Sequence, residues 1–373
     1  MRNKRIKILI LFLFVFMLTG CTKLLTDENK KPVKYESKLI CDCCNSKCEK
    51  LEEELKTHES TCKVDEESEE ETCDVSEEEI NKLKEDIVNC KKNCNDKCVL
   101  AKKNETGQNL TKNILCRPTN ADVLEIYEMN KVDLNELPSC QDFKLFSNYE
   151  GLWISIFVKP LAWLIIKLGV ILKNYGLSLV LISIAIRAVL MPLTKKTAMQ
   201  SENLKKAQPE LDRINKKYEN KSDNDSLMKK NEELLMVYKK YKINPLSSCL
   251  FAFIQIPLLF AFIEAINRTP AIFEGSFLGL HLGVTPWTAL KSGQWWYLII
   301  VVILALVTYY SLNMNKGASA GGMDTEKQMQ MMSKIMLVFI VYASFTLSTA
   351  ICMYWIASSA FTIFQNILVK RVK

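Results

Sequence analysis

Arg187 is the residue whose chemistry stands out first, because residues 176–193 around it are otherwise long and apolar enough to cross a bilayer. A lone cation at the centre of a membrane costs about 2.5–3.5 kcal/mol on insertion scales. A chain keeps such a residue where water or a polar partner can reach it, so this segment is predicted to form one wall of a hydrated cavity. Two structural interpretations stay open. Arg187 snorkels toward the cytoplasmic interface, or it serves as a hydrogen-bond hub.

No catalytic set accompanies this arginine. The chain of 373 residues contains two histidines, His58 and His281, and neither belongs to a Ser/His/Asp spacing, a P-loop or a zinc motif. The net charge of +7 reflects basic loops beside membrane segments, because the aromatic and basic residues are not interleaved as in single-strand-binding proteins. We therefore expect no enzyme activity, no metal site, no nucleic-acid partner and no cofactor apart from a covalent lipid.

The first 20 residues have the features of a lipoprotein signal peptide. Four basic residues precede an apolar stretch of eleven residues, 8–18, which is too short for an ordinary span. The following Leu18-Thr19-Gly20-Cys21 is similar to a bacterial lipobox, whose cysteine receives a diacylglycerol thioether. This predicts a lipid anchor on Cys21 at the outer face of the membrane. The alternative is an uncleaved signal anchor in which Cys21 has no role.

Residues 21–150 form a polar, cysteine-rich segment that we expect outside the membrane. Eleven of the fourteen cysteines lie between Cys41 and Cys140, a density that suits disulfides in an oxidising exterior. Because eleven is odd, at least one thiol is left over or pairs with another chain. Residues 61–80 carry ten acidic side chains and one lysine, which indicates a solvated connection.

A C-x3-C spacing occurs on both sides of that connection, at Cys44 and Cys48 and again at Cys90, Cys94 and Cys98. Positions i and i+4 share a helix face, and residues 46–59 and 76–103 are rich in helix formers. Two antiparallel helices stapled by two disulfides are therefore expected. Zinc is the competing interpretation, notably for residues 41–44, although zinc sites more commonly use C-x2-C spacing.

Five later segments are apolar and near the length needed to cross a bilayer, although the fourth is short. They are residues 176–194, 245–267, 295–314, 333–347 and 349–369.

Residues 151–173 are also apolar, but three lysines interrupt them. If they crossed the membrane, a lipidated N-terminus outside would place residues 195–244 outside as well. That segment holds thirteen Lys and Arg, whereas residues 269–293 hold one lysine. The positive-inside rule therefore favours an interfacial helix at 151–173, five spans, an outer N-terminus and a cytoplasmic C-terminus.

Residues 195–244 are predicted to form a cytoplasmic helical hairpin with a polar turn at 220–225. The apolar face of the first helix would carry Leu204, Leu211, Ile214 and Tyr218, and that of the second Leu227, Leu234, Leu235, Tyr238 and Tyr241. The alternative is a linker with snorkelling lysines.

Several short motifs follow one another at regular places in residues 151–373. They are Tyr175-Gly176, Ile186-Arg187, Met191-Pro192-Leu193-Thr194, Gln208-Pro209-Glu210-Leu211, Lys217-Tyr218, Tyr241-Lys242-Ile243-Asn244-Pro245-Leu246, Cys249, Ile254-Gln255-Ile256-Pro257 and Met353-Tyr354-Trp355. In this order they resemble the YidC membrane-protein insertases, and the pattern is most similar to the lipoprotein-type Gram-positive members. The chain departs from the family at four places. The family's glycine before the cysteine of the second span is Ser248 here, and the proline soon after it is Phe251. Residues 346–350 stand where the family has an aromatic-Pro-x-Gly bend, and Asn366 stands at the second position of its final Gln-Gln. A long basic C-terminal tail is missing, which argues against strong ribosome binding through that tail.

The resemblance implies an all-α membrane protein whose five spans surround a hydrophilic groove, open to the cytoplasm and to lipid and closed to the outside. It implies an insertase and chaperone that assists the insertion and folding of transmembrane segments in the bacterial plasma membrane. Its partners would be nascent membrane-protein clients and the bilayer, with the Sec translocon and the ribosome as further partners. The client-binding residues carried over from the family are Arg187, Gln255 and Trp355.

Each of these residues also has a plainer interpretation. Gln255 alone is more often an interhelical hydrogen bond, and Trp355 alone is more often packing. Glu264 and Arg268 are spaced i, i+4 and are expected to pair with each other. The main alternative function is a small multi-span transporter or channel, which usually brings internal repeats or intramembrane acid–base pairs. We find neither in the sequence.

Overall fold

The structure, a computed structural model, describes residues 23–60, 63–64, 71–72, 75–146, 149–219, 221, 223–243, 247–315 and 323–371. The predicted signal peptide and Cys21 lie outside these residues. The chain folds into two compact units. Of the described residues, the cysteine-rich unit takes those within Leu24–Lys112 and Pro118–Glu136, and the core unit takes Lys23, Asn113–Arg117 and those within Leu137–Lys373.

The cysteine-rich unit is built on a pair of long helices. Its elements are α2 (Ser37–Ser60), β1 (Lys63–Val64), β2 (Glu71–Thr72), α3 (Glu77–Asn104) and α4 (Ala121–Met129), with β1 and β2 antiparallel. Helix α3 begins where the sequence expects it, because the Ser76 side chain accepts from the Glu79 backbone and Glu79 returns the bond in a capping box.

Three disulfides join α2 to α3 in antiparallel order. They are Cys41–Cys98, Cys44–Cys94 and Cys48–Cys90, with Cα–Cα distances of 5.1, 5.5 and 5.8 Å. The prediction of two stapled C-x3-C pairs is confirmed, and the third disulfide extends the ladder by one helical turn. A fourth, Cys116–Cys140, lies in the core unit. Among the described cysteines of residues 41–140, Cys43 is a free thiol, and Cys62 and Cys73 of the odd count lie outside the described residues.

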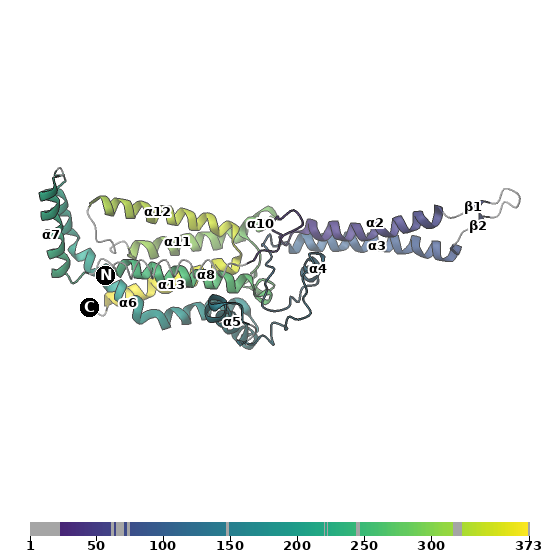
Figure 1. Cartoon of the computed structure of the whole chain (residues 1–373), viewed down its shortest axis with the longest axis horizontal. Coiled ribbons are helices and arrows are strands. Elements are labelled where there is room, and N and C mark those ends of the chain that lie inside the picture. The colour runs from purple at the N-terminus through teal and green to yellow at the C-terminus, as the bar shows by residue number, and fades with distance from the viewer. Residues whose placement is uncertain are drawn as a thin grey trace. The chain divides into compact units, whose positions relative to one another are not determined.

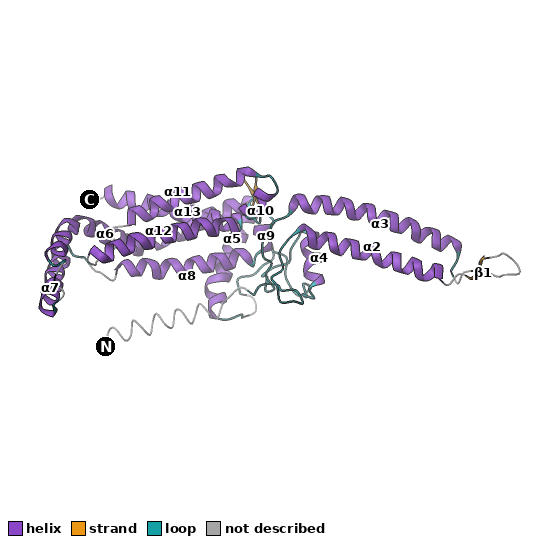
Figure 2. Cartoon of the chain, turned by 90° about the horizontal axis from the view of Figure 1, so that it is seen from above, coloured by secondary structure: helices purple, strands orange, loops and turns teal. Residues whose placement is uncertain are grey.

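The core unit is a helical bundle, with α8, α11, α12 and α13 side by side and α7 lying across one end (Figures 1 and 2). Its elements are η1 (Ile154–Val158), α5 (Lys159–Leu172), α6 (Tyr175–Lys217), α7 (Asn224–Lys240), α8 (Ser247–Asn267), α9 (Pro270–Phe273), β3 (Ser276–Phe277), β4 (Leu280–His281), α10 (Pro286–Lys291), η2 (Trp295–Tyr297), α11 (Leu298–Asn315), α12 (Met323–Thr346) and α13 (Thr349–Arg371). The antiparallel β3–β4 hairpin turns through Leu278 and Gly279, both with positive φ, as a two-residue turn of type I′ requires.

Four helical stretches of the described residues are long and apolar enough to cross a membrane. They are Ile154–Leu172, Tyr175–Pro192, Trp295–Met314 and Thr349–Val369, and shorter apolar helices run over Gln255–Asn267 and Ser333–Thr346. The prediction of a helical membrane protein is therefore confirmed, while the count of five spans stays a prediction. Residues 154–172 meet the same length and composition, so their placement along the interface stays a prediction.

Helix α6 differs from the expected break near residue 194, because it continues through Pro192 and Pro209 for 43 residues. The first span and the first hairpin helix are thus one helix. Each proline removes one backbone donor, and helix formers on both sides of Pro209 maintain the remaining hydrogen bonds.

The hairpin between α6 and α7 has a core much like the predicted one. It contains Leu204, Ala207, Leu211, Ile214, Tyr218, Leu234, Val237, Tyr238 and Ile243, with Tyr241 packed against it. The prediction was wrong for Leu227 and Leu235, which are 43% and 55% exposed. Val237 takes the inward place, because positions 234, 237, 238 and 241 share one helix face and position 235 lies about 100° from 234.

Two reciprocal clasps fasten the ends of this hairpin. Glu233 of α7 accepts from Lys217 Nζ at 2.6 Å and from Tyr218 OH at 3.0 Å. Glu210 of α6 accepts in the same way from Lys240 Nζ and from Tyr241 OH. Each Lys-Tyr pair at the end of one helix therefore binds a glutamate on the other.

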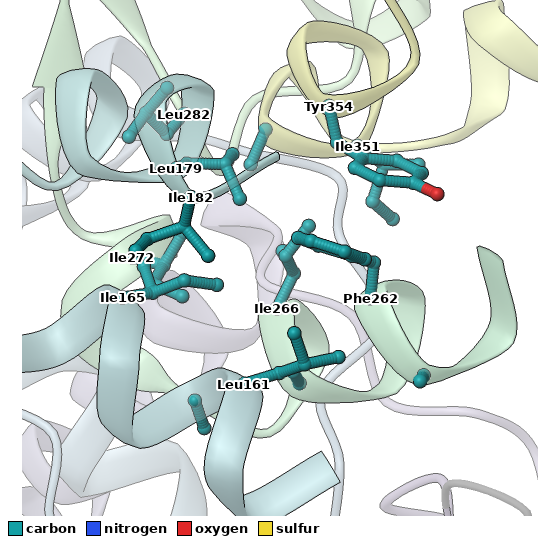
Figure 3. Close-up of a cluster of buried hydrophobic side chains, with 14 of the residues drawn as sticks. Leu161, Ile165, Leu179, Ile182, Phe262, Ile266, Ile272, Leu282, Ile351 and Tyr354 are labelled. Carbon is teal, nitrogen blue, oxygen red and sulfur yellow. The ribbon is translucent and has the colours of Figure 1, made fainter. Parts of the chain in front are cut away.

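The hydrophobic core of the bundle gathers where α5, α6, α8 and α13 meet. Figure 3 shows Leu161, Ile165, Leu179, Ile182, Phe262, Ile266, Ile351 and Tyr354 directed toward one another. The rings of Phe262 and Tyr354 stack with centroids 4.1 Å apart. Since lipid tails are as apolar as these side chains, close van der Waals packing is what holds such helices together in a bilayer.

Candidate functional site

Helices α6 and α13 run parallel and in register. Arg187 contacts Ser358 and Thr194 contacts Gln365, two pairs that are each separated by 171 residues along the chain. A step of seven residues on one helix therefore matches seven on the other, the spacing of left-handed helix packing. Seven residues rise about 10 Å along a helix, so these pairs form a buried polar seam of that length within an apolar bundle.

Arg187 lies at one end of the seam, and its side chain is 5% exposed. Its Nε donates to Ser358 Oγ at 2.7 Å, and its Nη2 donates to Ser358 Oγ and to Gln255 Oε1 of α8. Within the part of the chain that the structure describes, no carboxylate forms an ion pair with this guanidinium. Neutral oxygens accept hydrogen bonds from Nε and Nη2 but leave the charge of the guanidinium uncompensated.

The three predicted site residues are thus placed differently. Arg187 and Gln255 touch, as a hydrophilic groove lined by both would need. Trp355 lies three residues before Ser358 on α13, where it is partly buried and packs against the hydrophobic core. Among the described residues, the hydrogen bonds of Arg187 go to Ser358 and Gln255 and none goes to Trp355.

Sequence reasoning missed Ser358 and gave no role to Thr194 or Gln365. A serine inside an apolar helix is common and carries little signal by itself. The signal that was present is the pair of matching seven-residue spacings, 187 to 194 and 358 to 365. It becomes informative only after α6 and α13 are known to be parallel neighbours.

A second polar cluster lies at the C-terminal end of α8, and we call it the Arg268 charge cluster. Arg268 pairs through Nη2 with Glu150 and through Nη1 with Glu264 at 3.7 Å, and Lys159 pairs with Glu150 at 3.0 Å. Lys159 and Arg268 are 2% and 1% exposed, so both cations are buried. The expected pairing of Glu264 with Arg268 is confirmed, and two cations face two carboxylates.

The Arg268 charge cluster also fastens two neighbouring segments. Trp153 Nε1 donates to Glu264 Oε2 at 2.9 Å, which ties η1 to α8. Arg268 Nε donates to the carbonyl oxygen of Asn113, and the Arg268 carbonyl accepts from Leu115 N at 2.8 Å. Burial raises the pKa of Glu150, but Arg268 and Lys159 outweigh burial, so this pKa lies below its ordinary value.

A third charged group belongs to the cysteine-rich unit. Glu125 of α4 accepts from Lys47 of α2 and Lys97 of α3. Burial opposes ionisation of Glu125, but these hydrogen bonds prevail and lower its pKa to about 2. The Cys43 thiol donates to Glu125 at 3.4 Å, and burial with this contact raises the pKa of Cys43. The group therefore holds α4 against α2 and α3 and keeps the free Cys43 thiol protonated.

The zinc interpretation of the cysteines can be tested against the sulfur positions. Among the described residues, the sulfurs of Cys48, Cys90 and Cys94 lie within 4.8 Å of one another. All three are engaged in disulfides, Cys48 with Cys90 and Cys94 with Cys44. A zinc ligand must be a thiolate, so the oxidised ladder does not offer these sulfurs to a metal.

Comparisons with known proteins agree on one family. Residues 167–373 match the model of the family described as 60Kd inner membrane protein. The chain is 32% identical over 228 residues to the membrane protein insertase YidC of Oceanobacillus iheyensis, which covers 60% of this chain and 86% of the relative. It is 34% identical over 220 residues to the YidC of Alkalihalophilus pseudofirmus, covering 58% and 81%. It is 33% identical over 219 residues to the membrane protein insertase MisCA of Bacillus subtilis, covering 58% and 79%.

Proposed function

Because this chain belongs to the 60Kd inner membrane protein family, whose members include the YidC membrane protein insertases, we propose that Arg187 and Gln255 receive polar parts of a client in a hydrophilic groove. The chain is a membrane-protein insertase of the bacterial membrane, and it assists transmembrane segments in entering the bilayer. Trp355 is proposed to contact the apolar part of the same client. No covalent step is needed for this activity.

The barrier to insertion is the desolvation of the client's charged and backbone groups as they pass through hydrocarbon. A hydrated groove that reaches part-way into the membrane shortens this dry path. A cation within it attracts acidic residues of the client, and the attraction is stronger in a medium of low dielectric constant than in bulk water. The apolar segment then moves sideways into lipid, where hydrophobic burial stabilises it.

The single observation that carries the proposal is the set of partners around Arg187. Its contacts are hydroxyl and amide oxygens from Ser358 and Gln255, which a client carboxylate can replace or join. A guanidinium already paired with a carboxylate of the protein would attract a client carboxylate far less strongly. We also propose that the groove is closed toward the outside. The Arg268 charge cluster supports this, because it is buried and its carboxylates neutralise its cations.

Further parts of the proposal concern orientation and partners. The basic α6–α7 hairpin and the C-terminus would face the cytoplasm, and the cysteine-rich unit would lie outside behind a lipid on Cys21. The Sec translocon and the ribosome are proposed as partners that deliver clients to the cytoplasmic opening.

Depletion of the resident insertase followed by expression of this chain tests the function. We expect rescue of single-span client insertion. A photocrosslinking amino acid at Ile256, next to Gln255 and 46% exposed, should capture the nascent client. The same probe at Val302 of α11, which is 54% exposed, is the matched control and should capture lipid only. Equal client capture at both positions would refute the assignment of the groove.

A further inference from the structure

An apolar pocket of about 410 Å³ opens between α6, α11, α13 and the β3–β4 hairpin of the core unit. Its lining residues are Val180, Phe277, Leu278, Leu280, Trp296, Ile299, Ile300, Ile303, Met353, Ile356 and Ala357. Every one of these side chains is apolar or aromatic, so the pocket offers few partners for an ordered water.

The pocket lies among candidate membrane spans. Its three helices carry three of the candidate spans, Tyr175–Pro192, Trp295–Met314 and Thr349–Val369. Ile299, near the pocket entrance, is 60% exposed in the protein alone. In a bilayer, the molecules that surround such an apolar surface are the acyl chains of lipids.

The pocket is distinct from the polar seam. On α13 it uses Met353, Ile356 and Ala357, whereas Ser358 faces Arg187 and Tyr354 faces Phe262. At 3.6 residues per turn these two sets point about a third of a turn apart. A client helix with side chains is about 10–12 Å across, so one turn of it would already exceed the pocket volume of about 410 Å³.

The pocket entrance lies beside aromatic and basic residues. Trp296 is 52% exposed, and aromatic rings of this kind lie at the level of lipid headgroups. Asn174 Nδ2 donates to the Ser276 carbonyl, which brings the neighbouring Lys173 to the hairpin that borders the pocket. Helix α10 packs on η2, which contains the lining residue Trp296, and α10 ends at a second basic residue, Lys291.

Lys173, Lys291 and Glu274 belong to the segments that border the pocket, and they carry two positive charges and one negative. We propose that the pocket binds one acyl chain of an anionic phospholipid, whose phosphate lies near the lysines. The volume lies within the range of about 300–1,000 Å³ that is usual for small-molecule sites. The bound chain fills the space between α6, α11 and α13, and so supports α13 on a face about a third of a turn from the one that contacts Arg187.

The test uses the full chain in lipid nanodiscs with a phosphatidylglycerol that carries a photoreactive diazirine midway along one acyl chain. We expect the label to concentrate on pocket-lining residues of α11 and α13. Two variants reduce the space, Ala357→Phe in the wall and Ile299→Trp at the entrance. Val302→Trp, on the same helix as Ile299 and similarly exposed, is the matched control.

Both pocket variants should lose labelling of the lining by about tenfold, which corresponds to about 1.4 kcal/mol of binding free energy. The control variant Val302→Trp should keep the labelling of the pocket lining. Ile299→Trp remains informative if Ala357→Phe fails to fold, because Ile299 is a surface residue. Labelling that is equal on the lining and around Val302, or unchanged in Ile299→Trp, would overturn the site. Equal labelling by a phosphatidylcholine probe with the same chains would overturn the choice of an anionic headgroup.

Discussion

Arg187 and Arg268 are both buried, at 5% and 1% exposure, yet their surroundings differ in one respect. Arg268 is paired with Glu150 and Glu264, whereas Arg187 is bound by the neutral side chains of Ser358 and Gln255. A buried arginine with carboxylate partners is a structural element. A buried arginine with neutral partners keeps a positive potential that a client can use. The comparison therefore supports the proposal that Arg187 receives client residues, whereas Arg268 belongs to a structural charge cluster.

The difference also predicts how each site responds to mutation. Removing one member of a neutralised, buried cluster leaves the other charges without a partner, so the fold suffers. Removing Arg187 leaves only neutral groups behind, so activity suffers more than stability.

The largest effect is expected for Arg268→Leu, which leaves the carboxylates of Glu150 and Glu264 without their arginine. Loss of one partner of a buried ion pair typically costs about 3–5 kcal/mol. Denaturant unfolding of the purified chain in micelles measures it. Lys144→Leu, at an exposed lysine of the core unit, is the control and should change stability by less than about 0.5 kcal/mol. If Arg268→Leu lowers the free energy of unfolding no more than the control does, the Arg268 charge cluster does not stabilise the fold.

The next effect is expected for Arg187→Ala. Insertion of a client with an acidic N-terminal segment should fall by about tenfold, or about 1.4 kcal/mol, while Arg187→Lys keeps much of the rate. A protease-protection assay on the client measures insertion. The same client with its acidic residues changed to amides is the control and should be inserted equally well by both proteins. An equal loss for both clients would remove charge attraction from the mechanism.

A smaller effect is expected for Ser358→Ala, which removes the acceptor of Arg187 Nε. One hydrogen bond of this kind contributes about 1 kcal/mol, so insertion of the acidic client should fall several-fold. Ser358→Thr should restore it, and Ser359→Ala is the control at the neighbouring position. In an Arg187→Ala background the effect of Ser358→Ala should vanish. If it persists there, Ser358 acts through packing and does not position the guanidinium.

The smallest effect concerns pH. The pKa of Glu150 is lowered from 4.5 in the folded chain, so its contribution to stability is complete above that value and is lost as the pH falls through the lower, folded pKa. The melting temperature of the unmodified chain should therefore fall at acid pH more steeply than that of Glu150→Gln. The stability difference between Arg187→Ala and the unmodified chain should stay constant over this range, because Arg187 has no carboxylate partner among the described residues. Parallel melting curves for Glu150→Gln and the unmodified chain would contradict the pairing.

Much of the architecture followed from local pattern alone. Apolar runs gave the helices of the membrane core, the C-x3-C spacing gave two of the disulfides, and the i, i+4 spacing gave the pair of Glu264 with Arg268. These features depend on residues close in sequence, whose geometry on a helix is fixed by its 3.6-residue period. An arginine in an apolar run was also enough to identify Arg187 as the residue of interest.

Apart from Glu264, the partners of the two arginines were decided only by the tertiary structure. Ser358 lies 171 residues from Arg187 and Glu150 lies 118 residues from Arg268, so no local pattern joins them. The same holds for the continuous helix α6 and for the choice of Val237 over Leu235 in the hairpin, which depend on what packs against each face. Sequence determined that this chain places two cations among apolar helices. Packing between distant segments decided that carboxylates neutralise one of them and only neutral oxygens reach the other.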